Sequence, residues 1–345
     1  MEKREITIYD IAKQLNLSPS TVSRGLNDHS GINNKTKNKI LKLAHEMGYR
    51  SNKFASNLRK QSTNTIGVII PRLDSLFMSS VIAGIEKIAN EASFNLIISQ
   101  SLESENKEKS NARTMFNSRV DGLIVSLSNE TKDLSHFETF INKGVPLIFF
   151  DRVAEELPCT KVIIDNKQAG YTATKHLIDQ GCRNIVHITN RIQRNVYRDR
   201  FEGYLKALRE HGITYNEDFL ITNDLSEKSV INCIREDILK RKTLPEGIFI
   251  SNDFAAAIAI TTLKEMGIRV PQDIAVIGFN NDSISKVTEP SISTINYPGV
   301  EMGESVARIL VNHLKGKINL KITSTVVLNT ELIIRNSSMK KENLS

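Results

Sequence analysis

After residue 63 the sequence alternates short apolar runs with longer stretches in which apolar residues recur every three or four positions. Short apolar runs are typical of buried strands and the longer pattern of amphipathic helices, so the alternation predicts βαβ units and parallel sheets. The expected strands are residues 66–70, 96–99, 122–126, 147–150, 185–188, 247–251 and 275–279. The expected helices are residues 81–92, 169–177, 201–208, 255–266 and 303–314. So many units predict two doubly wound lobes.

The charge of the chain is concentrated in its first 62 residues. The formal charge of +7 equals the excess of twelve Lys and Arg over five Asp and Glu in this segment, so the remaining residues are neutral overall. Basic residues that neutralise phosphates supply sequence-independent affinity for DNA, which makes the segment a candidate nucleic-acid-binding head. A solvated basic face is the alternative interpretation.

Nothing in the sequence indicates a metal centre, a cofactor or a membrane anchor. Cys159, Cys182 and Cys233 are far apart and fit no metal-ligand spacing, so we expect core thiols in a reducing cytoplasm. No apolar run approaches the roughly 20 residues of a membrane-spanning helix, and the N-terminus lacks the apolar stretch of a signal peptide. We therefore expect a cytoplasmic protein.

The first 50 residues predict a helix-turn-helix. Thr7 can cap a first helix, and Ser18 can cap a second helix with Pro19 in its first turn. Val22 and Leu26 of the second helix point inward. Its outward face carries Ser20, Thr21, Ser23 and Arg24. A third helix follows Asn33 and ends at Gly48. A short, polar second helix of this kind is typical of one that enters the DNA major groove.

The head resembles the lactose/galactose-repressor family. The phrases that carry the resemblance are TIYDIA at residues 7–12, LSPSTVSR at 17–24, GY at 48–49 and NKFASNL at 52–58. The resemblance implies that Pro19, Ser20 and Arg24 read bases and that Thr21 and Ser23 lie near phosphates. The residues of the head expected to contact DNA are Thr7, Ser18, Pro19, Ser20, Thr21, Ser23, Arg24 and Asn27.

The recognition residues differ in what they can read. The Arg24 guanidinium can make a bidentate contact to guanine, whereas Pro19 can offer only an apolar contact, for example to a thymine methyl group. The Ser20 hydroxyl discriminates weakly because it can pair with several base edges.

In the family, the segment matching residues 52–58 forms a hinge helix on the operator and enters the minor groove. The residues expected to contact DNA here are Asn52, Lys53, Ala55 and Leu58. Leu58 would be an apolar wedge that opens a base step, with an ordinary interdomain contact as the alternative. Ser51 stands where many relatives have proline, which weakens the definition of the hinge helix.

The rest of the chain resembles the body of the same family, which is similar to periplasmic sugar-binding proteins. Phrases such as IGVIIP at residues 66–71, SND at 251–253 and PQDIAVIGF at 271–279 carry this match. The expected fold is an all-α helix-turn-helix head on an α/β two-lobed periplasmic-binding-protein-like body with doubly wound parallel sheets. The expected boundaries are a head at residues 1–50, a hinge at 51–62 and an effector-binding and dimerisation domain at 63–340. The N-lobe would comprise about 63–164 and 295–324, and the C-lobe about 165–294 and 325–340, with crossings near 165, 294 and 325.

A cleft between two such lobes is the expected effector site, because open α/β sheets bind ligands beyond the carboxyl ends of their strands. Short polar side chains follow three expected strands, and by resemblance an aromatic ring and two arginines join them. The resulting candidates are Phe77, Asp151, Arg194, Arg200, Asn252, Asp253 and Asn280. Asn280 departs from the Asp of many relatives, which suggests a ligand less rich in hydrogen-bond donors, or a weaker grip on sugar hydroxyls.

Four of these candidates have structural alternatives. Asp253 can cap the helix that follows it, and Arg200 can serve an interlobe ion pair. Asp151 can fix a turn, and Phe77 can belong to the core.

The sequence predicts a DNA-binding transcription regulator, most simply a repressor, controlled by a sugar, a sugar derivative or a nucleobase. Operator half-sites one helical turn apart would require a homodimer, or a tetramer built from it. A ligand-independent architectural DNA-binding protein is the alternative. Enzymatic activity is disfavoured because no phosphate-binding glycine loop, HExxH motif or GxSxG motif is present. We therefore assign no catalytic residue.

Overall fold

The computed structural model describes residues 6–49, 62–320 and 324–340. The chain divides into two compact units, Met1–Thr63 and Asn64–Ser345, which we describe separately as the head and the body. The hinge candidates Asn52, Lys53, Ala55 and Leu58 lie outside the described residues.

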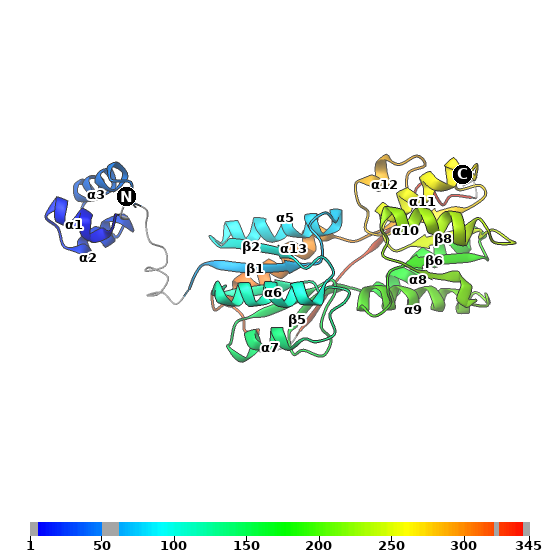
Figure 1. Ribbon diagram of the computed structural model, residues 1–345, viewed down its shortest axis with the longest axis horizontal. Coiled ribbons are helices and arrows are strands. Elements are labelled where there is room, and N and C mark those ends of the chain that lie inside the picture. Colours follow the sequence, from blue (N-terminus) through cyan, green and yellow to red (C-terminus); the bar gives the residue numbers. More distant parts are fainter. Residues whose placement is uncertain (1–5, 50–61, 321–323, 341–345) are drawn as a thin grey trace. The chain divides into compact units, whose positions relative to one another are not determined.

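The head is a bundle of three helices, α1 (Ile8–Leu15), α2 (Pro19–Leu26) and α3 (Asn34–Glu46) (Figure 1). Its core is formed by Ile11, Ala12, Val22, Ile40 and Ala44. The chain turns after α3 at Gly48, which has a φ of +67°, a conformation that favours glycine. The predicted three helices and the stop at Gly48 are confirmed.

The N-lobe of the body is built on a six-stranded parallel sheet with the strand order β11-β5-β4-β3-β1-β2. Its strands are β1 (Thr65–Ile70), β2 (Asn95–Gln100), β3 (Gly122–Val125), β4 (Leu147–Phe150), β5 (Thr160–Ile164) and β11 (Thr325–Leu328). Its helices are α5 (Leu76–Glu91), α6 (Glu105–Asn117), α7 (Ser135–Asn142) and α13 (Gly299–Leu314). In Figure 1, α5 and α6 cover opposite faces of this sheet.

The C-lobe is built on a four-stranded parallel sheet with the order β7-β6-β8-β9. Its strands are β6 (Ile185–Thr189), β7 (Leu220–Thr222), β8 (Gly247–Ile250) and β9 (Ala275–Ile277). Its α-helices are α8 (Asn166–Asp179), α9 (Asn195–Glu210), α10 (Glu227–Asn232), α11 (Asp253–Glu265) and α12 (Ile284–Val287). The short 3₁₀ helix η1 (Glu217–Phe219) precedes β7, and the π-helical segment η2 (Cys233–Ile238) continues α10. Every strand and helix expected in both lobes is present, with ends within six residues of those expected; the largest differences are the starts of α9 and α5, six and five residues earlier than expected.

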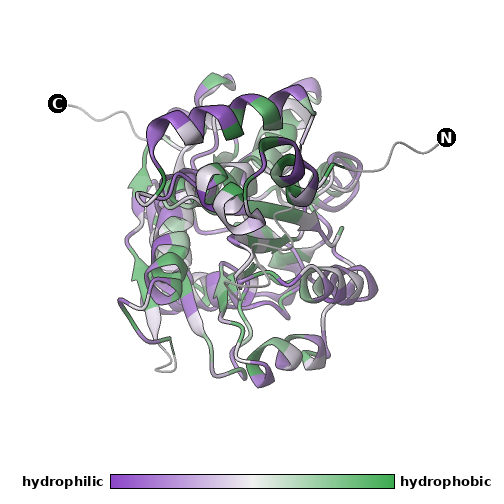
Figure 2. Cartoon of the chain, turned by 90° about the vertical axis from the view of Figure 1, so that its left-hand side faces the viewer, coloured by the Kyte–Doolittle hydropathy of each residue, from purple (hydrophilic) through white to green (hydrophobic). Residues whose placement is uncertain are grey.

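The two sheets owe their apolar composition to burial on both faces. All residues of β3, β4, β6 and β8 are buried, whereas polar residues gather on the outer faces of the helices, as the colouring of Figure 2 shows. Such sheets require helices on both sides, which the alternating sequence pattern supplies.

The chain passes between the lobes in three described segments. The first joins β5 to α8, the second runs from β10 (Thr294–Asn296) to α13, and the third joins β11 to β12 (Glu331–Ile333). The strands β10 and β12 pair with each other in an antiparallel arrangement. The third crossing therefore falls after Leu328 and not near residue 325, because β11 pairs with β5 and belongs to the N-lobe.

Within each lobe one pair of helices packs closely through glycines. A methyl group on Gly84 of α5 would lie 2.1 Å from the Val300 carbonyl oxygen of α13. A methyl group on Gly203 of α9 would lie 2.1 Å from the Lys167 carbonyl oxygen of α8. Only glycine permits this approach, so the position of α9 on α8 is fixed by backbone contact.

Candidate functional site

The helix α2 presents a polar face to solvent. Ser20 and Arg24 are exposed, whereas Val22 and Gly25 of the same helix are buried against the rest of the head. A methyl group on Gly25 would meet the Ile40 side chain of α3 at 2.5 Å, so the buried face is closely packed. Within the described part of the chain the Arg24 guanidinium has no hydrogen-bond partner. The side chain is therefore available to an external acceptor.

The start of α2 is held by a small network of hydroxyl groups. The Ser18 hydroxyl accepts a hydrogen bond from the Thr21 backbone amide at 3.1 Å. Its oxygen also lies 2.8 Å from the hydroxyl oxygens of both Ser20 and Thr21. The predicted cap at Ser18 is confirmed, and Pro19 occupies the first position of the helix.

The remaining head candidates lie around this face. Thr7 caps α1, and its amide and hydroxyl both donate to the Asp10 carboxylate, at 2.8 and 2.6 Å. Asn27 follows α2, is exposed, and donates from its amide to the Ser23 carbonyl oxygen at 2.7 Å. The face as a whole offers hydroxyl groups, an amide and one guanidinium, a set suited to phosphates and base edges.

In the body, Asp151 stands at the carboxyl end of β4. It is 4% exposed, and its φ of +56° puts it in the left-handed region. Its carboxylate accepts hydrogen bonds from the Tyr297 hydroxyl at 2.8 Å and from the Ser126 hydroxyl at 3.3 Å. Burial raises the pKa of Asp151, and the nearby charges of Arg152 and Arg200 act against that rise.

Arg200 is a buried cation of the C-lobe. Its Nε donates to Asn166 Oδ1 at 2.8 Å and its Nη1 donates to the Ser251 carbonyl oxygen at 3.0 Å. The guanidinium carbon lies 3.6 Å from the centre of the Phe279 ring, a cation–π contact. Burial lowers the pKa of Arg200, and the negative groups around it, Asp151 among them, act in the opposite direction. Both hydrogen-bond partners of Arg200 belong to the C-lobe, so these bonds do not form the interlobe ion pair considered as its alternative role.

Phe77, from the N-lobe, contacts Tyr297, which in turn lies close to Asp151 and Arg200. Its ring stacks on the Tyr297 ring with centres 4.2 Å apart and planes at 29°. Tyr297 follows β10 in a crossing segment, and the Arg200 guanidinium lies 5.6 Å from its ring centre. Phe77, Asp151 and Arg200 are thus brought together through Tyr297, a residue that the sequence did not single out.

Three other candidates form a separate group at the carboxyl ends of β8 and β9. Asn252 caps α11 by accepting a hydrogen bond from the Ala255 amide at 2.7 Å. Asp253 is fully buried, and its carboxylate accepts from the Asp282 amide at 2.8 Å. Asn280 donates to the Asp282 carboxylate at 3.2 Å. Asp253 therefore holds the loop after β9, and the helix cap that we considered for it belongs to its neighbour Asn252.

Arg194 precedes α9 and lies at the lobe boundary. It is half-buried, and its guanidinium donates to the Thr131 carbonyl oxygen of the N-lobe. Burial lowers its pKa. Because Arg194 is the cap residue of the helix that carries Arg200, the two arginines belong to the same element.

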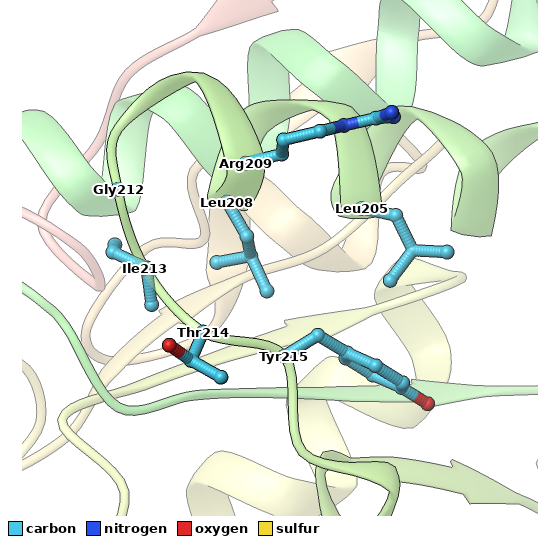
Figure 3. A pocket seen from close by; sticks show the side chains of 7 residues that line it. All are labelled: Leu205, Leu208, Arg209, Gly212, Ile213, Thr214 and Tyr215. Carbon is cyan, nitrogen blue, oxygen red and sulfur yellow. The ribbon is translucent and has the colours of Figure 1, made fainter.

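A surface depression of about 580 Å³ lies elsewhere, at the C-terminal end of α9 (Figure 3). Its lining is largely apolar and contains no predicted effector residue. The lining residues are Leu205, Leu208, Arg209, Gly212, Ile213, Thr214 and Tyr215. Across the described residues no group of three His, Cys, Asp or Glu side chains could hold a metal ion. No described helix is both long and apolar enough to cross a membrane.

Two family profiles match the chain. The profile described as bacterial regulatory proteins, lacI family, matches residues 7–52, which contain α1, α2 and α3. The profile of the periplasmic binding protein-like domain matches residues 174–338.

Full-length relatives match along almost the whole chain. The HTH-type transcriptional repressor PurR of Photobacterium profundum is 32% identical over 96% of this chain and 98% of its own. The catabolite control protein A of Priestia megaterium is 30% identical over 90% of this chain and 92% of its own.

Solved structures agree in fold. The lac repressor dimer bound to operator and the anti-inducer ONPF has a TM-score of 0.83 at 23% identity, and the match covers 97% of this chain and all of the other. The complex of the transcriptional regulator CelR with cellobiose has a TM-score of 0.72 at 25% identity, covering 96% of this chain and all of the other. From the helix-turn-helix at its start to the paired α/β lobes behind it, this chain belongs to the lacI family of bacterial regulatory proteins and is a DNA-binding transcription regulator.

Proposed function

We propose that this protein represses transcription as a homodimer on a pseudo-palindromic operator, and that a small polar molecule held between the lobes changes its operator affinity. In this proposal residues 1–50 read the DNA and residues 63–340 bind the ligand and form the dimer. Residues 51–62 are the hinge that joins these two parts of the chain. The protein acts in the cytoplasm, where the DNA is.

The exposed polar face of α2 is the observation that carries the DNA-binding proposal. Arg24 would read a guanine, Ser20 would add a weaker contact, and Pro19 would make an apolar contact with the groove. Ser18, Thr21, Ser23 and Asn27 have the hydroxyl and amide groups that bind phosphate oxygens. Thr7 would approach the backbone from the start of α1, as helix N-termini do.

The connecting residues have a separate role in the proposal. Asn52, Lys53 and Ala55 would line the minor groove, and Leu58 would enter a base step as an apolar wedge. The kink would let both heads of the dimer reach their half-sites.

The cluster around Tyr297 supports a ligand site between the lobes. Phe77 supplies an aromatic face, Asp151 a buried acceptor and Arg200 a buried donor, the three kinds of group that orient a sugar or a nucleobase. Arg194, Asn252 and Asn280 would contribute from the rim. One solved relative is a complex with cellobiose, and another relative is a ribose operon repressor, which supports a sugar or sugar derivative.

Two experiments test the proposal. Selection from random duplexes with the full-length protein should enrich a two-fold symmetric sequence, and enrichment of no sequence would contradict DNA reading by α2. A thermal-shift screen of sugars, sugar phosphates and nucleobases should then identify at least one compound that raises the melting temperature. A screen without any shift, together with a normal operator, would favour a ligand-independent architectural protein.

A further inference from the structure

The first turn of α9 contacts the N-lobe with several side chains. Asn195 donates from its amide to the Asp151 carbonyl oxygen at 2.9 Å, and its own oxygen accepts from the Val153 amide at 3.2 Å. One side chain of the C-lobe thus binds the N-lobe backbone on both sides of Arg152. The adjacent Arg194 binds the Thr131 carbonyl oxygen, also in the N-lobe.

Arg152 lies at the centre of these contacts. Its Nη1 donates to both carboxylate oxygens of Glu103, at 2.8 and 2.9 Å, and its Nη2 donates to the Tyr197 hydroxyl at 2.9 Å. Its guanidinium carbon also lies 5.4 Å from the centre of the Tyr197 ring. Arg152 and Tyr197 are each only 8% exposed. A buried cation therefore connects an acid of its own lobe to a phenol of the other lobe.

An exposed ion pair lies outside this contact. Arg198 of α9 pairs with Glu155 of the N-lobe at 2.8 Å, but both side chains are 39% or more exposed. Exposed pairs contribute little because water and salt screen them, whereas hydrogen bonds to buried charges are stronger. Arg152, Glu103, Asn195 and Tyr197 form the buried part of the contact between the first turn of α9 and the N-lobe, and we call these four residues the latch.

The N-lobe side of the latch is held in place by Glu103, which lies two residues before α6, and by Glu108 of α6. Glu103 accepts from the Asn129 amide at 2.8 Å, and the buried Glu108 accepts from the Ser128 amide at 2.8 Å. The Thr131 hydroxyl also donates to Glu108, at 2.8 Å. The loop that offers its carbonyl oxygen to Arg194 is therefore fixed to the same segment that holds Glu103.

The latch is joined directly to the candidate ligand site. Asp151 directly precedes Arg152 in the chain and has a left-handed backbone conformation. The Asp151 side chain bonds to Tyr297, whereas the Arg152 side chain bonds to Tyr197. On the other side Arg200 follows Tyr197 by one helical turn of α9. Each half of the latch thus shares a short rigid segment with a residue proposed to bind the ligand.

We propose that Arg152 is a positioning residue for the effector response: together with Glu103 and Tyr197 it holds the two lobes closed in the absence of ligand. This inference rests on the proposed ligand-gated function, because closure matters to regulation only if a ligand binds between the lobes. A ligand then meets a preformed site, and a weaker latch lowers its apparent affinity in proportion to the fraction of closed molecules.

Pulsed electron paramagnetic resonance on the full chain tests the latch without DNA or ligand. Spin labels are attached at Lys143→Cys in the N-lobe and Lys242→Cys in the C-lobe, both exposed positions, while the three native cysteines are buried. Mixing with excess unlabelled protein suppresses distances between subunits. The parent protein should give one narrow distance distribution. Arg152→Gln should lower the ratio of closed to open molecules at least tenfold.

Two further variants keep the test decisive. Tyr197→Phe removes only the hydroxyl and keeps the ring, so it should fold and give an intermediate distribution. Arg209→Gln, on the exposed side of the same helix, should leave the distribution unchanged. Identical distributions for the parent, Arg152→Gln and Tyr197→Phe would overturn the latch, as would a broad distribution in the parent. Either outcome leaves DNA selection by the head unaffected, so failure of the latch is distinguishable from failure of the proposed function.

Discussion

The Tyr297 hydroxyl donates a 2.8 Å hydrogen bond to the Asp151 carboxylate, and this bond joins the crossing segment after β10 to the end of β4. Both residues are less than 5% exposed. Burial raises the pKa of Asp151 and also raises the pKa of Tyr297. The hydrogen bond between them therefore replaces hydrogen bonds to water that both groups lose when they are buried. The same tyrosine stacks on Phe77, so one side chain organises most of the candidate ligand site.

Tyr297→Phe tests that arrangement. The substitution keeps the stacking ring but leaves one oxygen of a buried carboxylate without its donor, which should reduce the free energy of unfolding by about 1–3 kcal/mol. Urea unfolding of the full chain provides the measurement. Tyr215→Phe is the matched control, because no partner for the Tyr215 hydroxyl is found among the described residues. Equal stability of the parent and Tyr297→Phe would show that the bond is unimportant.

Arg24→Ala tests the recognition helix. Loss of one bidentate base contact should weaken specific binding by about 1–3 kcal/mol and relax base preference at one position in each half-site. Fluorescence anisotropy with the selected operator and with a random duplex measures both effects. Lys42→Ala, on the exposed side of α3, should change neither the affinity for the operator nor the base preference. A loss of affinity that is equal on operator and random DNA would contradict base reading by Arg24.

Gly203→Ala tests the close packing of α8 against α9. The added methyl group would lie 2.1 Å from the Lys167 carbonyl oxygen, so the helices must separate. Overpacking of this kind should cost about 3 kcal/mol and should displace Arg200, which is carried by the same helix. Unfolding measurements should show the loss, while Arg209→Ala on the exposed face of α9 should stay within about 0.5 kcal/mol of the parent. A fully stable Gly203→Ala variant would show that the helices tolerate separation.

His187 predicts the response of the C-lobe to acid. Its ring is fully buried, stacks on Phe249 at 4.3 Å and donates from Nδ1 to the Phe249 carbonyl oxygen, and burial lowers its pKa to about 3. The unfolded chain, with an ordinary histidine pKa near 6.5, therefore binds more protons between these values. The His187 contribution to stability is complete above pH 6.5 and declines as the pH falls toward 3.

His187→Asn isolates this contribution, because the amide can still donate to Phe249 but does not titrate. The parent should lose about 2 kcal/mol relative to the variant between pH 7 and pH 5. Unfolding free energies measured across this range in both proteins provide the comparison. Parallel pH profiles would mean that His187 is accessible to protons in the folded state.

The head could be predicted almost completely from the sequence because its determinants are local. A cap such as Ser18 and a stop such as Gly48 act on neighbouring residues, so their positions along the chain are sufficient. The strands of both lobes were also predictable where burial on two faces makes a continuous apolar run, as in β4 and β8. The strand β11 was missed for the opposite reason: it is an edge strand that alternates exposed and half-buried residues.

The candidate site was predictable only in part. Asp151 and Arg200 follow recognisable patterns, but Tyr297 and Tyr197 contribute through contacts between segments far apart in the chain, which leave no local signal. Asp253 shows the converse difficulty. A carboxylate at the start of a helix looks the same in sequence whether it faces a cleft or, as here, a neighbouring loop.

In the proposed function, ligand binding between the lobes changes the affinity of the head for DNA. Operator affinity measured by anisotropy, with and without the compound that gives the largest thermal shift, tests it most directly. The operator affinity should change at least fivefold, and the same factor must appear when the affinity for that compound is measured with and without operator. Unchanged operator affinity at saturating compound would contradict the account.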